Sequence, residues 1–314
     1  MPPTFPAGTL LVDAETGEID RYSDGSRHLI SPPVVTQMGV TASQLTPVSA
    51  SNFSLIPQGA DYFPEGMYLR NAQTGEISQY SGSDFHLVSV PVATKMGLNG
   101  SNVVTITAEQ YDNVPKGTDY FPQGMLIQNS QTGEIDIYNS GQRQLISVPV
   151  ANVMNITAAQ LTTISASQFN EIPPGLAYFP QNVYLQNQVT GEISEYSGGY
   201  NHVVSVPVAT VMGLTSSQLI PVPPSQYNAI PQGNAYYPEG IFIQNNQTGE
   251  IDQITGGQRH WVSPQAALEI GLTSSQIAVI GADQFNAIPL SGNFVVPPSA
   301  TGTTQGQSSG NTGS

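Results

Sequence analysis

One spacing organises this chain. The triplet Thr-Gly-Glu occurs five times, and each occurrence follows the last by 58 residues with no insertion or deletion between copies. The five triplets begin at Thr16, Thr74, Thr132, Thr190 and Thr248. A fixed period of this length is typical of small structural units that pack on their neighbours. The period therefore constrains the fold more than the length of 314 residues does.

The repeat also defines the expected domain. It predicts a single five-repeat domain over residues 1–298, with repeats at about 5–62, 63–120, 121–178, 179–236 and 237–294. Residues 299–314 contain only Gly, Ser, Thr, Gln, Asn and one Ala. That composition predicts a disordered polar tail.

The second copy illustrates the local structure expected of every repeat. A β-favouring run at 67–71, a Thr-Gly turn and an alternating run at 76–80 predict a hairpin. Residues 85–89 predict a third strand, and a short helix should follow and end at Gly97, where a left-handed cap is expected. A fourth strand is predicted at 103–106, before a second helical turn that opens with capping-box spacing.

Two architectures accommodate such units. Each unit is too small to bury its apolar faces alone, so neighbouring copies must pack together. Residues 4–6 and 294–296 occupy the same repeat position, and this phase match predicts an all-β, five-bladed β-propeller in which each blade has about four strands and a short helix. An open β-rich solenoid is the alternative, favoured by divergence of the fifth copy at Ile254 and Gln265.

Composition excludes several partners. The formal charge is −15, from 22 acidic and 7 basic residues, so nucleic acid and anionic membranes are not expected partners. There is no Cys, which excludes disulfides, thiol nucleophiles and thiolate metal sites. No apolar run approaches the length of a membrane span, and the first residues lack the basic and apolar regions of an ordinary signal peptide.

A histidine position is the sharpest candidate for chemistry. The members are His28, His86, His202 and His260, and the third copy has Gln144 instead. No constant carboxylate or second histidine accompanies them, whereas a metal site or a general base needs such partners. We therefore expect buried imidazoles bonded to backbone, with a binding role as the alternative, and we expect no metal, no cofactor and no catalytic residue.

Two other constant positions are expected to be structural. The glutamates after the turn glycine are predicted to bond to the hairpin, although a ring of five carboxylates could also hold cations; they are Glu18, Glu76, Glu134, Glu192 and Glu250. The serines before the first helix are predicted N-caps; they are Ser31, Ser89, Ser147, Ser205 and Ser263.

A polar and aromatic set repeats beside these positions. The tyrosines between copies are Tyr62, Tyr120, Tyr178 and Tyr236. The amides at the end of the first strand are Asn71, Asn129, Asn187 and Asn245, with Gln128, Gln186 and Gln244. Aromatic faces and amides are the chemistry that holds neutral sugars, so these residues are candidate carbohydrate sites, with inter-repeat packing and strand-end hydrogen bonding as the alternative.

Three motifs together resemble a blade-like repeat of secreted or surface-associated bacterial proteins. They are Thr-Gly-Glu-Ile, Arg-His-Leu-Ile-Ser at 27–31 and Ile-Pro-x-Gly at 56–59. The copy number is similar to that of five-bladed propeller lectins, although the single Trp261 does not match their tryptophan-rich motifs. The resemblance implies an extracellular or cell-surface protein.

These observations predict a multivalent, lectin-like protein that binds glycans or glycoproteins and is not an enzyme. The alternative is a structural or adhesive scaffold that does not bind sugar. An enzyme would need a set of catalytic residues that is unique to one copy. The residues that depart from the repeat do not form such a set; they are Trp261, Lys95, Lys116 and Arg143.

Overall fold

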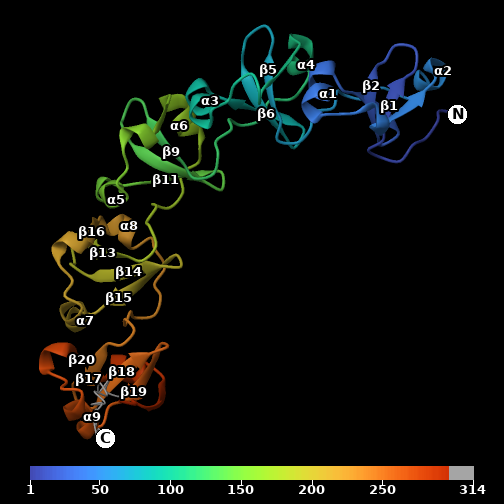
Figure 1. Cartoon of the computed structure of the whole chain (residues 1–314). Helices are drawn as coiled ribbons and strands as arrows, with labels where there is room; N and C mark the ends of the chain where they lie inside the picture. The colour runs from blue at the N-terminus through green and yellow to red at the C-terminus, as the bar shows by residue number, and fades with distance from the viewer. Residues whose placement is uncertain (297–314) are drawn as a thin grey trace, which may run out of the picture. The chain divides into compact units, whose positions relative to one another are not determined.

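The computed structural model describes residues 1–296, so the predicted tail at 299–314 lies outside the described residues. Each 58-residue repeat forms its own sheet, with one short helix between its third and fourth strands and a second after the fourth (Figure 1). Four sheets have four strands, and the fifth has five.

The element bounds follow the repeat. The first repeat contains β1 (Leu10–Asp13), β2 (Ile19–Ser23), β3 (Ser26–Leu29), α1 (Pro32–Met38), η1 (Ala42–Gln44), β4 (Leu45–Val48) and α2 (Ala50–Phe53). The second contains β5 (Tyr68–Asn71), β6 (Ile77–Ser81), β7 (Asp84–Val88), α3 (Val90–Met96), β8 (Val104–Ile106) and α4 (Ala108–Asp112). The third contains β9 (Met125–Asn129), β10 (Ile135–Asn139), β11 (Gln142–Leu145), α5 (Val148–Val153), η2 (Ala158–Gln160), β12 (Thr162–Ile164) and α6 (Ala166–Glu171).

The last two repeats keep this order. The fourth contains β13 (Val183–Asn187), β14 (Ile193–Ser197), β15 (Tyr200–Val204), α7 (Val206–Val211), η3 (Ser216–Gln218), β16 (Leu219–Val222) and α8 (Pro224–Tyr227). The fifth contains β17 (Phe242–Asn245), β18 (Ile251–Thr255), β19 (Gln258–Trp261), α9 (Pro264–Glu269), η4 (Ser274–Gln276), β20 (Ile277–Ile280), α10 (Ala282–Asn286) and β21 (Leu290–Asn293).

The prediction of an all-β five-bladed propeller was wrong. In every sheet the first strand lies between an antiparallel hairpin partner and the fourth strand, with which it pairs in parallel, as in Leu11 opposite Thr46. A parallel pair needs a long crossover, and here the first helix supplies it. The result is a mixed α/β repeat fold, and no closed propeller occurs among residues 1–296.

Local signals in the sequence predicted the elements well. In the second repeat the hairpin turns at Gly75 with φ of 77°, and α3 ends at Gly97 with φ of 69°, both in the left-handed region that favours glycine. The capping box at Thr107 opens α4 as its spacing predicts. The serine position lies at the N-cap of α1, α3, α7 and α9, but only Ser263 accepts a capping bond, from Ala266 N.

Helices connect neighbouring repeats. The first helix of each of the first four repeats packs on the fourth strand of the next: α1 on β8, α3 on β12, α5 on β16 and α7 on β20. Val34 of α1, for example, shares a buried cluster with Leu69 and Val104 of the second repeat. The second helix covers its own sheet. The core of each repeat after the first is therefore completed by a helix from the repeat before it.

The chain groups into two compact units. The first comprises Met1–Ser147 and Asn155–Tyr178, and the second comprises Val148–Met154 and the chain from Phe179 onward. Helix α5 belongs to the second unit because it packs on β16. Among the helices described, none is both long and apolar enough to cross a membrane.

Candidate functional site

One residue from each of the first three strands lines up across the sheet. We call these three residues the cross-strand row. In the fourth repeat Tyr184 pairs with Glu195, which pairs with His202. Paired residues share one face of an antiparallel sheet, so the histidine position lies on the same face as the first-strand aromatic ring. The rows are Leu10–Arg21–His28, Tyr68–Gln79–His86, Leu126–Ile137–Gln144, Tyr184–Glu195–His202 and Phe242–Gln253–His260.

The linker that leaves each repeat adds an aromatic ring to its row. The rings of Tyr184 and Tyr236 meet edge to face with centroids 6.2 Å apart. Phe294 takes the equivalent position against Phe242 at 6.0 Å. The predicted tyrosines at this position are half-buried, and two more of them meet the row of the preceding sheet: Tyr120 meets Tyr68 at 6.1 Å, and Tyr62 lies under the Arg21 guanidinium at 4.8 Å.

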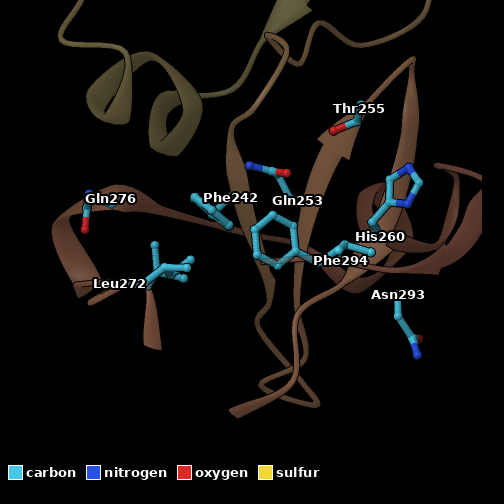
Figure 2. Close-up of a pocket in the computed structure, with 10 residues that line it drawn as sticks. Phe242, Gln253, Thr255, His260, Leu272, Gln276, Asn293 and Phe294 are labelled. Atoms are coloured by element: carbon cyan, nitrogen blue, oxygen red, sulfur yellow. The ribbon is translucent and has the colours of Figure 1, made fainter. Parts of the chain in front are cut away.

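Open grooves lie along this row in the second compact unit. The repeat-4 groove has a volume of about 420 Å³, and its lining includes the whole row with Ser197 and Tyr236. The repeat-5 groove has a volume of about 630 Å³. Figure 2 shows Phe242, Gln253 and Phe294 in the middle of the repeat-5 groove, with His260 and Asn293 at one end and Leu272 and Gln276 at the other. Both volumes fall within the range of small-molecule sites.

The two grooves differ in charge. Glu195 in the repeat-4 groove is buried and accepts a hydrogen bond of 2.8 Å from Ser197 Oγ. Its counterpart in the repeat-5 groove is the neutral Gln253. Burial, together with the neighbouring Tyr236 hydroxyl, raises the pKa of Tyr184, so the Tyr184 phenol stays neutral. The repeat-5 groove thus offers amides, an imidazole and aromatic edges without a carboxylate.

The histidines tie the linker to the sheet. His28, His86 and His202 are half-buried, and Nδ1 of each lies 2.8–2.9 Å from a linker carbonyl oxygen, which Nδ1–H satisfies as a donor. A linker glycine packs on each ring: a Cβ built on Gly233 would lie 2.4 Å from His202 Cε1. Glycine is thus required for close approach to the ring. Each of these three histidines fixes the linker and also forms part of its row.

The predicted asparagines lie elsewhere. The four asparagines are buried at the start of the hairpin turn, and Oδ1 of each accepts hydrogen bonds from backbone amides of that turn. They are Asn71, Asn129, Asn187 and Asn245. The linings of the two grooves contain neither these residues nor Gln128, Gln186 and Gln244. Gln128 and Gln244 instead donate to the carbonyl oxygens of the hairpin glycines Gly133 and Gly249.

A second repeated site had not been predicted. In the odd-numbered repeats a buried aspartate pairs with an arginine that also stacks on a phenylalanine. Arg259 Nη1 lies 2.9 Å from Asp252 and 3.1 Å from Glu250, and its guanidinium lies 4.6 Å from the Phe285 ring. The equivalent sets are Asp20, Arg27 and Phe53 in the first repeat and Asp136, Arg143 and Phe169 in the third.

The even-numbered repeats replace this ion pair with hydroxyl groups. Ser78 bonds to Tyr111 in the second repeat, and Ser194 bonds to Tyr227 in the fourth. Lys116 takes the place of the arginine in the second repeat, with Nζ 3.9 Å from the Tyr111 ring centroid. Burial lowers its pKa, with nearby carboxylates acting in the opposite direction. The sequence signal for this site was an alternation of residue type between odd and even repeats at the positions equivalent to residues 20, 27 and 53.

The constant glutamates accept hydrogen bonds, most of them from residues of these buried sets. Glu18, Glu134 and Glu250 accept from the arginines, Glu76 accepts from Thr74 Oγ1, and Glu192 accepts from the Tyr227 hydroxyl. Each glutamate backbone amide also donates to the turn threonine hydroxyl. Within residues 1–296, no group of three or more His, Asp or Glu side chains is placed to hold a metal ion.

Comparisons with known proteins give no family. No family model matches the chain, and no curated protein matches it. Among solved structures, a chain of the periplasmic assembly from the ESX-5 inner membrane complex is 13% identical, with coverage of 91% of this chain and 93% of that one and a TM-score of 0.17. A chain of the EccB3 dimer from the ESX-3 core complex is 11% identical, with coverage of 91% and 98% and the same TM-score of 0.17. Likeness at this level carries no conclusion about function.

Proposed function

We propose that the protein is a non-catalytic, multi-repeat carbohydrate-binding protein whose cross-strand rows hold neutral sugars. The observation that carries this proposal is the recurrence of one groove at equivalent positions of two successive repeats. The linker aromatic residue and the histidine both line each groove, and both of these positions recur through the chain.

The chemistry of the repeat-5 groove supports a neutral, hydroxylated ligand. Phe242 and Phe294 present apolar ring surface, which suits the C–H face of a sugar ring. Gln253 and Asn293 offer both donors and acceptors, which suit sugar hydroxyls. The chain's charge of −15 disfavours anionic ligands.

Repetition supports multivalent binding. Weak sites on one body gain avidity toward a surface that displays many copies of a ligand, if their geometry allows simultaneous engagement. A glycan-coated surface is such a target. We therefore place the protein outside the cell or at a cell surface, where it would meet glycans or glycoproteins.

A glycan array followed by calorimetry tests the proposal. We expect binding to neutral glycans, and we expect Phe294→Ala to weaken it about fivefold, because about 1 kcal/mol of aromatic contact is lost. Val189→Ala is the matched control, since Val189 is exposed at a hairpin turn and outside both groove linings. Absence of binding on a broad array, or equal affinity of the Phe294→Ala and wild-type proteins, would overturn the proposal.

A structural or adhesive scaffold is the second candidate. The interlocking of each first helix with the next sheet favours it, because such coupling suits a load-bearing array. Cells that display the chain would then adhere to one another or to a matrix, and free mono- and oligosaccharides would not inhibit adhesion. Inhibition by sugar would favour the carbohydrate-binding function instead.

A further inference from the structure

We propose that helix α9 of one chain docks on the first repeat's sheet of a second copy, so that copies associate head to tail. The interface would reproduce the contact that joins neighbouring repeats within the chain. This inference goes beyond carbohydrate binding. Because Ile270, Leu272 and Phe294 also line the repeat-5 groove, a docked copy and a sugar would compete for that groove.

The internal interface is well defined because it occurs four times. At the last of these contacts, Val208 and Ala209 of α7 share a buried cluster with Ile243 and Ile280 of the fifth repeat. Met212 and Leu214, just beyond the helix, pack against the same cluster. A helix with small and branched apolar residues on one face, followed by two larger apolar residues, therefore completes the core of the next sheet.

The fifth repeat keeps this apolar face but has no sheet to cover within residues 1–296. Ala266 and Ala267 occupy the positions of Val208 and Ala209, and Ile270 and Leu272 occupy those of Met212 and Leu214. The last described strand is β21, which pairs with β19 of the same repeat. Ile270 and Leu272 instead line the open repeat-5 groove. Ala266 is buried within its own repeat, whereas Ala267, Ile270 and Leu272 are half-buried and carry the apolar face that remains accessible.

The first repeat has the complementary surface. The position of Thr46 on β4 is buried in the four later repeats, where the preceding helix packs, but Thr46 itself is only half-buried. The residues at this position are Val104, Thr162, Ile220 and Ala278, exposed by 5%, 3%, 2% and 0%. Thr162 shows that a threonine fits beneath the helix. Phe5 is also half-buried, whereas its counterpart Phe63 is 2% exposed.

The two ends are also in phase. Residue 294 occupies the repeat position of Tyr62, and Phe5 occupies that of Phe63. Phe294 of one copy and Phe5 of the next would therefore supply the aromatic pair that adjacent residues supply within the chain. Residues 297–314 contain no apolar side chain larger than proline. The contact is heterologous, so it builds rings or open chains of copies.

Sedimentation velocity with complementary variants tests the proposal. Ile270→Asp with Leu272→Asp removes the donor face, and Thr46→Arg blocks the acceptor face. We expect the wild-type chain to associate at about 100 µM, and more strongly at higher salt because screening weakens repulsion between acidic copies. Each variant alone should stay monomeric, whereas an equimolar mixture should form a one-to-one dimer through the two intact ends.

Controls separate assembly from folding and from sugar binding. Leu268→Thr lies on α9 at a position that is 78% exposed and should associate like the wild type. Circular dichroism and fluorescence of Trp261, the single tryptophan, report whether the fifth repeat remains folded. A Phe5→Asp variant provides a second acceptor block if Thr46→Arg unfolds. A monomeric wild type at about 100 µM, or a mixture that forms no dimer, would overturn the inference and leave sugar binding untouched.

Discussion

Residues that recur at equivalent positions of four or five copies make mainly local structural contacts. The turn asparagines and glutamates satisfy hairpin groups, and the linker glycines allow close approach to the histidines. The histidine position was predicted to bond to backbone, and its Nδ1 contacts are consistent with that expectation. Its place in a groove could not be predicted, because only the strand register brings it beside the aromatic residues.

The contact between glycine and histidine predicts a steric effect. Gly233→Ala should lower the free energy of unfolding by about 1–3 kcal/mol, because the new Cβ would overlap the His202 ring. Adding His202→Ala should restore most of that stability. Gly175→Ala is the matched control, since its nearest neighbour is the flexible Gln142 Oε1 at 2.9 Å. Urea denaturation measures all four proteins, and equal losses for Gly233→Ala and Gly175→Ala would contradict the contact.

The alternating buried sets predict a compensated exchange. Arg259→Asn leaves Asp252 buried without its cation, so it should cost about 3–5 kcal/mol. Installing the whole fourth-repeat set, Asp252→Ser with Arg259→Asn and Phe285→Tyr, should bring the loss to within about 1 kcal/mol. Trp261 pairs with Asp252 across β18 and β19, so its fluorescence follows this unfolding directly. A triple variant no more stable than Arg259→Asn would show that the sets are not equivalent.

Burial also predicts a pH dependence. Burial raises the pKa of Asp252 above the ordinary value of 3.8, and Arg259 opposes the shift. The folded state then binds the proton more tightly than the unfolded state, so this group stabilises the fold most below pH 3.8 and loses that contribution as pH rises through its raised pKa. The triple variant should therefore gain stability relative to the wild type as pH rises from 3.8 through the raised pKa of Asp252. An unchanged difference in urea midpoint over that range would refute this assignment.

At the scale of elements, local sequence signals predicted where the strands and helices lie better than they predicted how the strands pair. Turn glycines, capping boxes and alternating runs indicated the hairpins and helices close to their observed bounds. The parallel pairing of the first and fourth strands was missed, because a four-residue strand such as Leu45–Val48 carries no local mark of its partner's direction. That omission led from a four-strand unit to an antiparallel propeller blade.

The interlocking helices predict a stability effect that crosses between repeats. Val208→Ala in α7 should lower the stability of the fifth repeat by about 1–3 kcal/mol, because Val208 is fully buried against the next sheet. Trp261 fluorescence reports that loss in a repeat that carries no substitution. Val206→Ala, on the same helix at a position 77% exposed, should have little effect. Unaltered unfolding of the fifth repeat in Val208→Ala would show that the helix does not couple neighbours.

At the scale of the whole molecule, the 58-residue period and the acidic charge limited function without identifying it. The charge of −15 argued against polyanions, and the copies supplied equivalent positions for a repeated site. The groove itself could not be read from sequence, since it needs residues of three strands and the linker on one face. Tyr236 was predicted and lines a groove, whereas Tyr184 and Glu195 were not singled out.

Imidazole NMR during a sugar titration tests the central proposal most directly. The chain has four histidines, one in each row except that of the third repeat, so each ring signal reports on its own row. A neutral sugar identified on the array should shift the signals of His202 and His260, which line the two grooves. Those shifts should saturate at the affinity measured by calorimetry. Saturable sugar binding that leaves both signals unmoved would contradict the assignment of these grooves as the binding site.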